Sequence, residues 1–583
     1  YTSAAGATSA TVSVQNNDLR GIVHSVAGSN SEIYFSINRS VNNCTVAYNT
    51  LTNINTNTSG SIYMFYDNLA KSSGQTTTYD NNSIVTGFTN PTSVGSLYGI
   101  WTSGLSSSGS FVNITNNNFS NINSGCQFVF PIAELEGLSS SSGPSATVTG
   151  NTISNVTGTY GFIWVIHIDA AASINCSSNS ISNISGTGPI TGIYIDGNNG
   201  SGNSTLASNV LSGLSSTGTG GSVMGMYNTS SLPATVSFIA NTVTNLSSTG
   251  ASANVSGIYN NSGNSITLSS NLINNISASG TTAPFVTGIN VVGGTTLNIY
   301  LNKLHTISAT GAYSGASVLV AGINLAAGIT VNVYNNFVSD LTAPGASSLE
   351  VMRGISVISL VASSNYYLYY NSIYLDASST GTDFGTTGIY HTVSATASTA
   401  ALTMIDNIVK NTSTAGGTGF TVAFKNSGTA LNNFSSSSDY NLYYAGTPSA
   451  TNLIFYNGTN SDQTLTAYQT RVSPREANSI SVSPNFTSAT NLHILSTSNC
   501  AIEGRGTPVG GYITDIDGAT RNATTPDIGA DEFSGAYSTL AGIAGTAVCE
   551  NKTVSATGST YANSSCNLIT YILPSGGSPV SGK

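Results

Sequence analysis

The residues with the clearest potential for chemistry are His167, Asp169 and Asp196. His167 and Asp169 alternate along one apolar segment, so both should lie on the same face of a strand, and Asp196 occupies a similar segment further along the chain. Two carboxylates beside a histidine could supply the acid and the base of a hydrolase or lyase reaction. However, no Arg or Lys lies near them in the sequence, and Asp196-Gly197 is also a common turn sequence. We therefore expect no catalytic site and retain these three residues as the candidates to test.

Other chemically informative motifs are scarce. Glu134 and Glu136 belong to an acidic loop that could at most hold Ca²⁺ weakly. The sequence has no Cys/His spacing typical of zinc, no nucleophile elbow with suitable Asp and His, and no phosphate-binding loop. We expect no cofactor and no metal other than weakly bound calcium.

The composition excludes several classes of partner. Only 6% of the 583 residues are charged, with 13 basic against 23 acidic side chains, whereas 39% are hydrophobic. Disordered chains are less hydrophobic and more highly charged, and nucleic-acid-binding proteins carry basic patches that are missing here. No segment has the length and apolarity of a transmembrane helix. The low charge and the abundance of Ser, Thr and Asn are typical of exported proteins, so we expect an extracellular location.

These few charged residues are spread over a repeated sequence motif, which is clearest as TVTGNTISNV at residues 147–156. Its centre is an Asn with apolar residues three and five positions before it and two and usually five positions after it. The Asn recurs every 28 to 36 residues, and more weakly once more at Asn441: Asn17, Asn49, Asn82, Asn117, Asn151, Asn179, Asn209, Asn241, Asn271, Asn302, Asn336, Asn371 and Asn407. A period of this size indicates a stacked repeat architecture.

Each repeat contains three short stretches that look like strands. Alternating apolar residues precede the Asn, a second stretch follows it, and after a Ser/Gly/Thr tract comes a third with a Gly-Ile centre, as at Gly192-Ile193. The sequence therefore predicts an all-β fold, a right-handed parallel β-helix of about 14 three-strand coils, followed by a small β-rich module. At the corner, Asn tolerates a left-handed backbone, and one Asn per coil can form a ladder of side-chain hydrogen bonds.

Two further residue types have alternative interpretations. Tyr367, Tyr369 and Tyr443 fall in Tyr-rich segments, where outward rings could contact a glycan but could equally be ordinary sheet surface or core. Cys44 and Cys176 take inward positions and should be small buried residues. Cys549 and Cys566 lie beyond the repeats and could form a disulfide, although the sequence cannot give their separation.

The C-terminal part carries a distinctive set of motifs: Pro484-Asn485-Phe486, Asn491 to Ile494, Ala501 to Gly504, Asp515 to Gly518 with Arg521, and PDIGADE at residues 526–532. This set of motifs resembles the C-terminal end of secreted bacterial right-handed parallel β-helix surface proteins. The resemblance implies a block that closes the C-terminal end of the helix, with Asp and Arg in a capping network. Residues 534–583 look like the start of a second module of the sort appended to surface proteins of the type IX secretion system.

These observations give three predicted regions: β-helix repeats at 1–462, C-terminal coils and the closing block at 463–533, and the start of a second β-rich module, apparently truncated, at 534–583. The predicted function is an exported, non-enzymatic structural surface protein, a rigid stalk, adhesin or filament segment. Its partners would be other copies or downstream domains of the same polypeptide, or glycans. The alternative is a polysaccharide-active or glycan-binding β-helix protein. An uncapped first coil that polymerises end to end is a third hypothesis.

Overall fold

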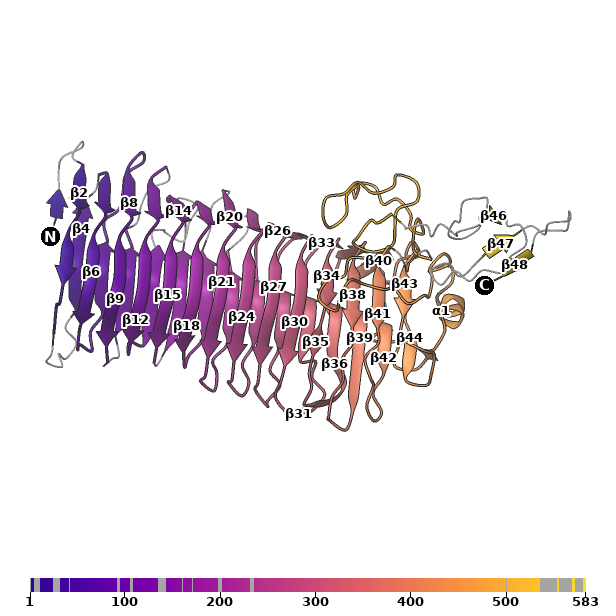
Figure 1. Ribbon diagram of the computed structural model, residues 1–583. Helices are drawn as coiled ribbons and strands as arrows, with labels where there is room; N and C mark the ends of the chain where they lie inside the picture. The colour runs from indigo at the N-terminus through magenta and orange to yellow at the C-terminus, as the bar shows by residue number, and fades with distance from the viewer. Residues whose placement is uncertain are drawn as a thin grey trace.

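The structure is a computed structural model that describes most of the 583 residues. The described residues are 2–4, 11–24, 32–40, 42–91, 95–104, 109–134, 143–159, 161–169, 171–197, 202–230, 235–496, 498–499, 501–534, 553–554, 569–571 and 580–582. Figure 1 shows an elongated stack of strands that runs from the N-terminal end to helix α1.

The stack is a parallel β-solenoid of about 13 turns, which confirms the predicted fold class. Three sheets run along it, and every pairing described within them is parallel except that of β44 with β45. Sheet A contains β1 (Thr2–Ala4), β4 (Ile33–Ser40), β7 (Ile62–Asp67), β10 (Ser96–Thr102), β13 (Phe128–Glu134), β16 (Phe162–Asp169), β19 (Ile190–Asp196), β22 (Val223–Asn228), β25 (Val255–Asn260), β28 (Val286–Val291), β31 (Tyr313–Ser314), β32 (Val320–Leu325), β36 (Ala346–Val357), β39 (Phe384–His391), β42 (Thr421–Asn426), β44 (Asn452–Tyr456) and β45 (Ser461–Asp462).

Sheets B and C form the two arms on either side of the Asn corner. Sheet B contains β2 (Val12–Gln15), β5 (Cys44–Ala47), β8 (Thr76–Asp80), β11 (Phe111–Thr115), β14 (Ser145–Thr149), β17 (Ser173–Ser177), β20 (Asn203–Ala207), β23 (Thr235–Ile239), β26 (Ser265–Ser269), β29 (Thr296–Tyr300), β33 (Thr330–Tyr334), β37 (Asn365–Tyr369) and β40 (Ala401–Ile405). Sheet C contains β3 (Asp18–Arg20), β6 (Thr50–Asn55), β9 (Ser83–Asn90), β12 (Asn118–Ser124), β15 (Thr152–Gly158), β18 (Ser180–Gly186), β21 (Val210–Ser216), β24 (Thr242–Ser248), β27 (Leu272–Ala278), β30 (Lys303–Ala309), β34 (Phe337–Ser339), β35 (Leu341–Thr342), β38 (Ser372–Leu375), β41 (Ile408–Asn411) and β43 (Leu442–Tyr444).

The core follows from the alternation of apolar and polar residues in each strand. In β26, Ile266 and Leu268 are fully buried while Ser265 and Thr267, which alternate with them, are half-buried, as expected for a strand with one face inward. The coils stack in register, so Ile266 lies beside Leu297 of β29, and the inward residues form one continuous hydrophobic core. Cys44 and Cys176 belong to this core as free thiols, which confirms their predicted role.

The repeated Asn forms an unbroken ladder from Asn17 to Asn441. Each side-chain Nδ2 donates to Oδ1 of the Asn in the next coil at 2.8–3.0 Å. Asn241 is typical: its Nδ2 also donates to the Leu206 carbonyl, and its Oδ1 accepts from the backbone N–H and Nδ2 of Asn209. Because the buried amides satisfy one another in this way, the predicted ladder is confirmed.

One detail of the corner differs from the prediction. The left-handed residue is the one immediately before the ladder Asn, as at Ser208 (φ 55°), Ala240 (φ 53°) and Ser270 (φ 56°), and not the Asn itself. The physical reason is a division of roles: the preceding residue makes the bend, which leaves the Asn free to point its side chain inward.

The end of the solenoid is covered by α1 (Leu465–Val472), which Figure 1 shows beyond β44. Thr464 caps this helix by accepting a hydrogen bond from the backbone N–H of Ala467. Tyr468 and Val472 are fully buried, and the Tyr468 ring packs against Phe455 with centroids 4.7 Å apart. The helix, and not the predicted closing block, therefore caps the hydrophobic core.

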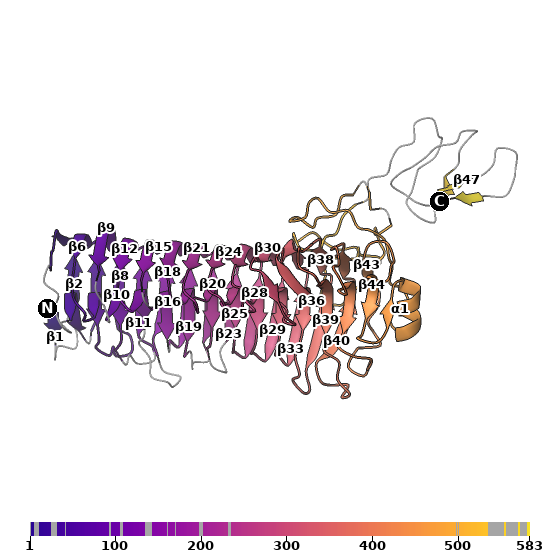
Figure 2. The same ribbon diagram turned by 90° about the horizontal axis from the view of Figure 1, so that it is seen from below.

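Residues 480–534, called here the closing segment, lie along the side of the last coils (Figure 2). Phe486, Leu492 and Ile528 pack in a second hydrophobic cluster with Phe337 and Ile408 from the outer surface of sheet C. The prediction that this block closes the end is wrong, because the apolar outer residues of β34 and β41 require cover on the side. Its Asp and Arg form a hydrogen-bonded network there: the guanidinium of Arg521 donates to Asn335 Oδ1 and to the Gly529 carbonyl.

The expected second module falls almost entirely outside the described residues. Three short strands are described there, β46 (Thr553–Val554), β47 (Ile569–Tyr571) and β48 (Val580–Gly582), and they form a separate sheet. Cys549 and Cys566 lie outside the described residues, as does the acidic loop at Glu136, and the side chain of Glu134 is likewise not described. Among the described residues, no helix is long and apolar enough to cross a membrane.

Candidate functional site

The three candidate catalytic residues do come from adjacent coils. His167 and Asp169 are on β16, and in the register of β16 with β19 Asp169 lies beside Asp196, while His167 lies beside Tyr194. The sequence therefore placed Asp196 on the correct strand, one coil after Asp169.

The histidine is not hydrogen-bonded to either carboxylate. His167 is only 7% exposed, and neither ring nitrogen has a hydrogen-bond partner among the described residues. Its ring stacks on Tyr194 with centroids 4.8 Å apart, and Trp164 meets it edge-on at 4.7 Å. Burial lowers the pKa of His167 to about 4, although the charge of Asp196 acts in the opposite direction. The imidazole is thus neutral at pH 7 and serves as one ring in an aromatic stack.

Asp196 is engaged in local hydrogen bonds. Its carboxylate accepts from the Thr229 hydroxyl at 2.7 Å, from the Gly197 backbone N–H at 2.7 Å and from the Tyr194 hydroxyl at 3.0 Å. Three donors from its own turn and the next coil hold the carboxylate as a structural acceptor. His167 donates no hydrogen bond to this carboxylate and accepts none from its donors.

What surrounds His167 is an aromatic strip on the outer surface of sheet A. It runs over the strands from β4 to β25 and consists of Tyr34, Tyr63, Tyr66, Tyr98, Trp101, Phe130, Trp164, His167, Tyr194, Tyr227 and Tyr259. Successive rings stack across coils, as for Tyr63 and Tyr98 (centroids 5.0 Å apart, planes 9° apart) and Tyr98 and Phe130 (5.0 Å, 4°). Part of the strip, centred on Tyr98 and Phe130, forms a hydrophobic cluster separate from the core.

The ring faces of the strip are largely covered by neighbouring rings. Tyr98 and Tyr194 are each 8% exposed, and burial raises the pKa of Tyr98 to about 12. The indole N–H of Trp101 is buried without a partner among the described residues. The strip therefore offers mainly ring edges and hydroxyl groups to an approaching molecule.

Sequence reasoning missed this strip, although a signal for it was present. The residue directly after the Gly-Ile centre of the third strand is aromatic in several coils, as in Gly99-Ile100-Trp101 and Gly257-Ile258-Tyr259. That position faces outward, so the repeat itself stacks these rings.

The predicted glycan contacts are placed differently. Tyr443 is fully buried and donates its hydroxyl to Glu476 Oε1 at 3.0 Å, so a glycan cannot reach it and this part of the prediction is wrong. Tyr369 is 9% exposed and packs against Tyr512 of the closing segment at 5.2 Å. Tyr367 is half-buried beside Tyr369, at 5.9 Å between centroids. These rings serve mainly to hold the closing segment on the solenoid.

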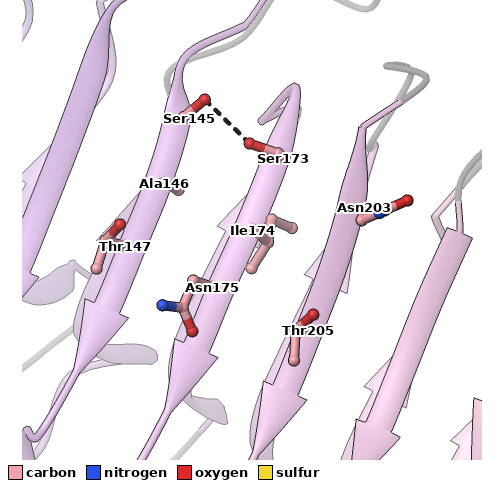
Figure 3. A pocket seen from close by; sticks show the side chains of 8 residues that line it. All are labelled: Ser145, Ala146, Thr147, Ser173, Ile174, Asn175, Asn203 and Thr205. Atoms are coloured by element: carbon pink, nitrogen blue, oxygen red, sulfur yellow. Dashed lines mark hydrogen bonds between the residues drawn. The ribbon is translucent and has the colours of Figure 1, made fainter.

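A shallow depression on the outer surface of sheet B is the remaining concave feature we consider (Figure 3). It spans β14, β17 and β20, and the hydroxyl of Ser173 donates to Ser145 at 3.0 Å across two of these strands. Its lining is small and uncharged: Ser145, Ala146, Thr147, Ser173, Ile174, Asn175, Asn203 and Thr205. Such side chains offer hydrogen bonds but no nucleophile activated by a base.

No protein-family model matches the chain, and no curated protein matches it. The fold and the site together define the chain as a parallel β-solenoid with an internal Asn ladder and an external aromatic strip.

Proposed function

We propose that the chain is a rigid segment of an exported, non-enzymatic structural protein of the cell surface, acting as a stalk, an adhesin or part of a filament. The observation that carries this proposal is the uninterrupted Asn ladder, with its continuous core over the whole solenoid. Stacked in-register strands with satisfied internal amides make a stiff rod. The ring stacking of His167 and the hydrogen bonds of Asp196, the strongest catalytic candidates, support structural roles for both residues.

The location can be tested on native material. Antibodies against the chain should label straight rods on the cell surface, or rods released from it, in negative-stain micrographs. Labelling confined to the cell interior would overturn the exported location. Incubation with a panel of polysaccharides should give no cleavage, whereas turnover abolished by Asp169→Ala would replace the structural function with an enzymatic one.

The aromatic strip favours glycan binding as a second candidate function. Aromatic rings and Tyr hydroxyl groups are the side chains that commonly contact sugars, and here they form one continuous line over eight coils from β4 to β25. In a glycan-array experiment, Trp101→Ala should weaken binding at least tenfold, and Tyr456→Ala, outside the strip, should not. An array with no binding by the unaltered chain would remove this candidate and leave the structural one intact.

A further inference from the structure

A buried ion pair lies at the C-terminal end of β7. The side chains of Asp67 and Lys71 are both fully buried, and Lys71 Nζ donates to Asp67 Oδ2 at 2.8 Å. It is the most deeply buried ion pair among the described residues, since in the others at least one side chain keeps contact with solvent. Because two buried charges lose their hydration, such a pair contributes little to stability by itself.

The preceding coil supplies a third side chain to this pair. In the register of β4 with β7, Asn38 lies beside Asp67, and Asn38 Nδ2 donates to Asp67 Oδ2 at 2.8 Å, the same oxygen that accepts from Lys71. A primary amine and a carboxamide from adjacent coils therefore meet at one carboxylate oxygen. Asn38 is only 2% exposed, and its Oδ1 has no hydrogen-bond partner among the described residues. An unsatisfied buried carbonyl oxygen is uncommon, and here it remains available to a proton donor.

These three side chains are the components of an amide exchange reaction. The Lys71 amine is a nucleophile, the side-chain carbonyl carbon of Asn38 is an electrophile, and the Asp67 carboxyl group can take up and return a proton. Burial raises the pKa of Asp67, although Lys71 and the hydrogen bonds from Leu69 and Asn38 act in the opposite direction. The fold holds the reacting groups together in a dry site, which replaces a collision between separate molecules.

We propose that Lys71 Nζ and Asn38 Cγ form an intramolecular isopeptide bond, with Asp67 as the proton carrier. A proton first passes from the Lys71 ammonium group to the Asp67 carboxylate. The lone pair of Nζ then forms a bond to Cγ, while the carbonyl electron pair moves to Oδ1, which accepts a hydrogen bond from the Asp67 carboxyl group. Return of that electron pair breaks the Cγ–Nδ2 bond, and Asp67 gives its proton to Nδ2, which leaves as ammonia, and takes one from Nζ. The products are one secondary amide, one ammonia molecule and protonated Asp67, so the reaction consumes no oxidant and no cofactor.

The bond would join two coils covalently. Asn38 is on β4 and Lys71 follows β7, so the cross-link closes a loop that contains the Asn49 rung of the ladder. A cross-link limits the conformations of the unfolded chain, as a disulfide does, and so stabilises the coils that it joins. This inference does not depend on what the chain binds.

The test is the mass of the full chain after denaturation. The unaltered chain should weigh less than its sequence by one ammonia molecule, and tandem mass spectrometry of a digest should find Asn38 joined to Lys71. Lys71→Arg keeps a positive charge for Asp67 but lacks the nucleophilic amine, so its mass should equal that of its sequence. Lys303→Arg, which alters a solvent-accessible lysine on β30, is the matched control and should lose ammonia as the unaltered chain does. Circular dichroism would establish that each variant is folded.

Asp67→Ala tests the proton carrier. Without the carboxyl group, the fraction of cross-linked chain at a fixed time after purification should fall about tenfold or more. The full mass in the unaltered folded chain, ammonia loss retained in Lys71→Arg, or an undiminished cross-link in Asp67→Ala would overturn the proposal. So would a deficit of one water molecule with Lys71 joined to Asp67, because Asp67 would then be the acceptor and not the proton carrier. The masses of the unaltered chain and of Lys71→Arg decide whether the cross-link forms even if Asp67→Ala does not fold.

Discussion

The Asn ladder and the aromatic strip both run along the stacked coils, but the ladder has one Asn in every coil, whereas the strip has one or two rings per coil and ends at β25. The ladder extends from Asn17 to Asn441, whereas the strip gives way to Asn290 and Asn324 after Tyr259. A missing amide inside the corner would leave buried donors and acceptors without hydrogen-bond partners, so every coil must supply an Asn. A missing ring on the outer surface loses only contact area. The difference shows that polar burial constrains a repeat more strictly than apolar stacking.

The strongest way to break the ladder is to remove one rung in its middle. Asn241→Ala deletes two donated and two accepted hydrogen bonds and leaves the Asn209 N–H without its acceptor. We expect the free energy of unfolding to fall by about 3 kcal/mol, measured by denaturant titration. Asn332→Ala is the matched control, because its amide also bonds across coils, to Asn298, but on the half-buried outer surface. A loss as large in the control would show that burial is not the cause.

The last rung tests what happens when the column ends in an acid. Asn441 Nδ2 donates to Glu476 Oε2 at 3.1 Å, and complete burial raises the pKa of Glu476 to about 7, while hydrogen bonds from Ser479, Asn441 and Tyr443 act in the opposite direction. The folded state therefore holds this proton more tightly than the unfolded state. Stability should be greatest below about pH 4.5 for this group and fall by up to about 3 kcal/mol as the pH rises through 7.

Glu476→Gln isolates that contribution, because Gln preserves an oxygen for Asn441 and does not titrate. The difference in unfolding free energy between the variant and the unaltered chain should change between pH 4.5 and pH 8, measured by denaturant titration at each pH. Asp527, whose pKa burial raises to about 8, titrates in both chains and cancels in the difference. A difference that is constant with pH would contradict the assignment.

Within the strip, His167 can become charged, so its contribution to stability should depend on pH. Its folded pKa of about 4 lies below the ordinary value of 6.5, so the unfolded chain binds the proton more tightly and stability is lost as the pH falls below 6.5. His167→Phe keeps a ring in the stack and should be more stable than the unaltered chain by about 2 kcal/mol at pH 5, with little difference at pH 7. Equal melting temperatures at both pH values would contradict this prediction.

The smallest effect should come from removing the ring at the end of the strip. Trp164 contacts Phe162, His167 and Tyr194 at 4.4–4.7 Å, whereas Tyr259 contacts Tyr227 at 5.1 Å at the end of the strip. Trp164→Ala should cost about 2 kcal/mol and Tyr259→Ala about 1 kcal/mol, measured by thermal unfolding. Equal costs would mean that the rings contribute independently and not as a stack.

The inward-facing residues could be predicted from the sequence because their pattern depends only on neighbouring positions along the chain. The alternation around each Asn and the constant spacing predicted the strands, the sheet order and the ladder. The burial of the outward-facing residues could not be predicted in this way, since alternation alone assigns every outward position to the solvent-exposed surface. Trp101 packs against Tyr63 of the preceding coil and Tyr194 against Tyr227 of the next, and Tyr443 is covered by α1 and Glu476.

The lateral position of the closing segment had a signal that we did not use. The residue directly after the ladder Asn is polar in many early coils, as at Thr152 and Ser180, but becomes Phe337, Ile408 and Leu442 in later ones. These three side chains face outward and are buried by the closing segment. A single apolar residue at this position is not sufficient, since Val210 is 47% exposed, but its recurrence in the late coils indicates that another part of the chain packs on that surface.

The ladder also has an electrostatic direction. Every rung donates toward the C-terminal neighbour, so the amide dipoles of the side chains add along the axis of the solenoid, as peptide dipoles add along a helix. The positive end of this column points at the carboxyl group of Glu476. The aligned amide dipoles stabilise a buried anion at that position, as peptide dipoles stabilise an anion at a helix N-terminus. This stabilisation offsets part of the cost of burying the charge of an acid there.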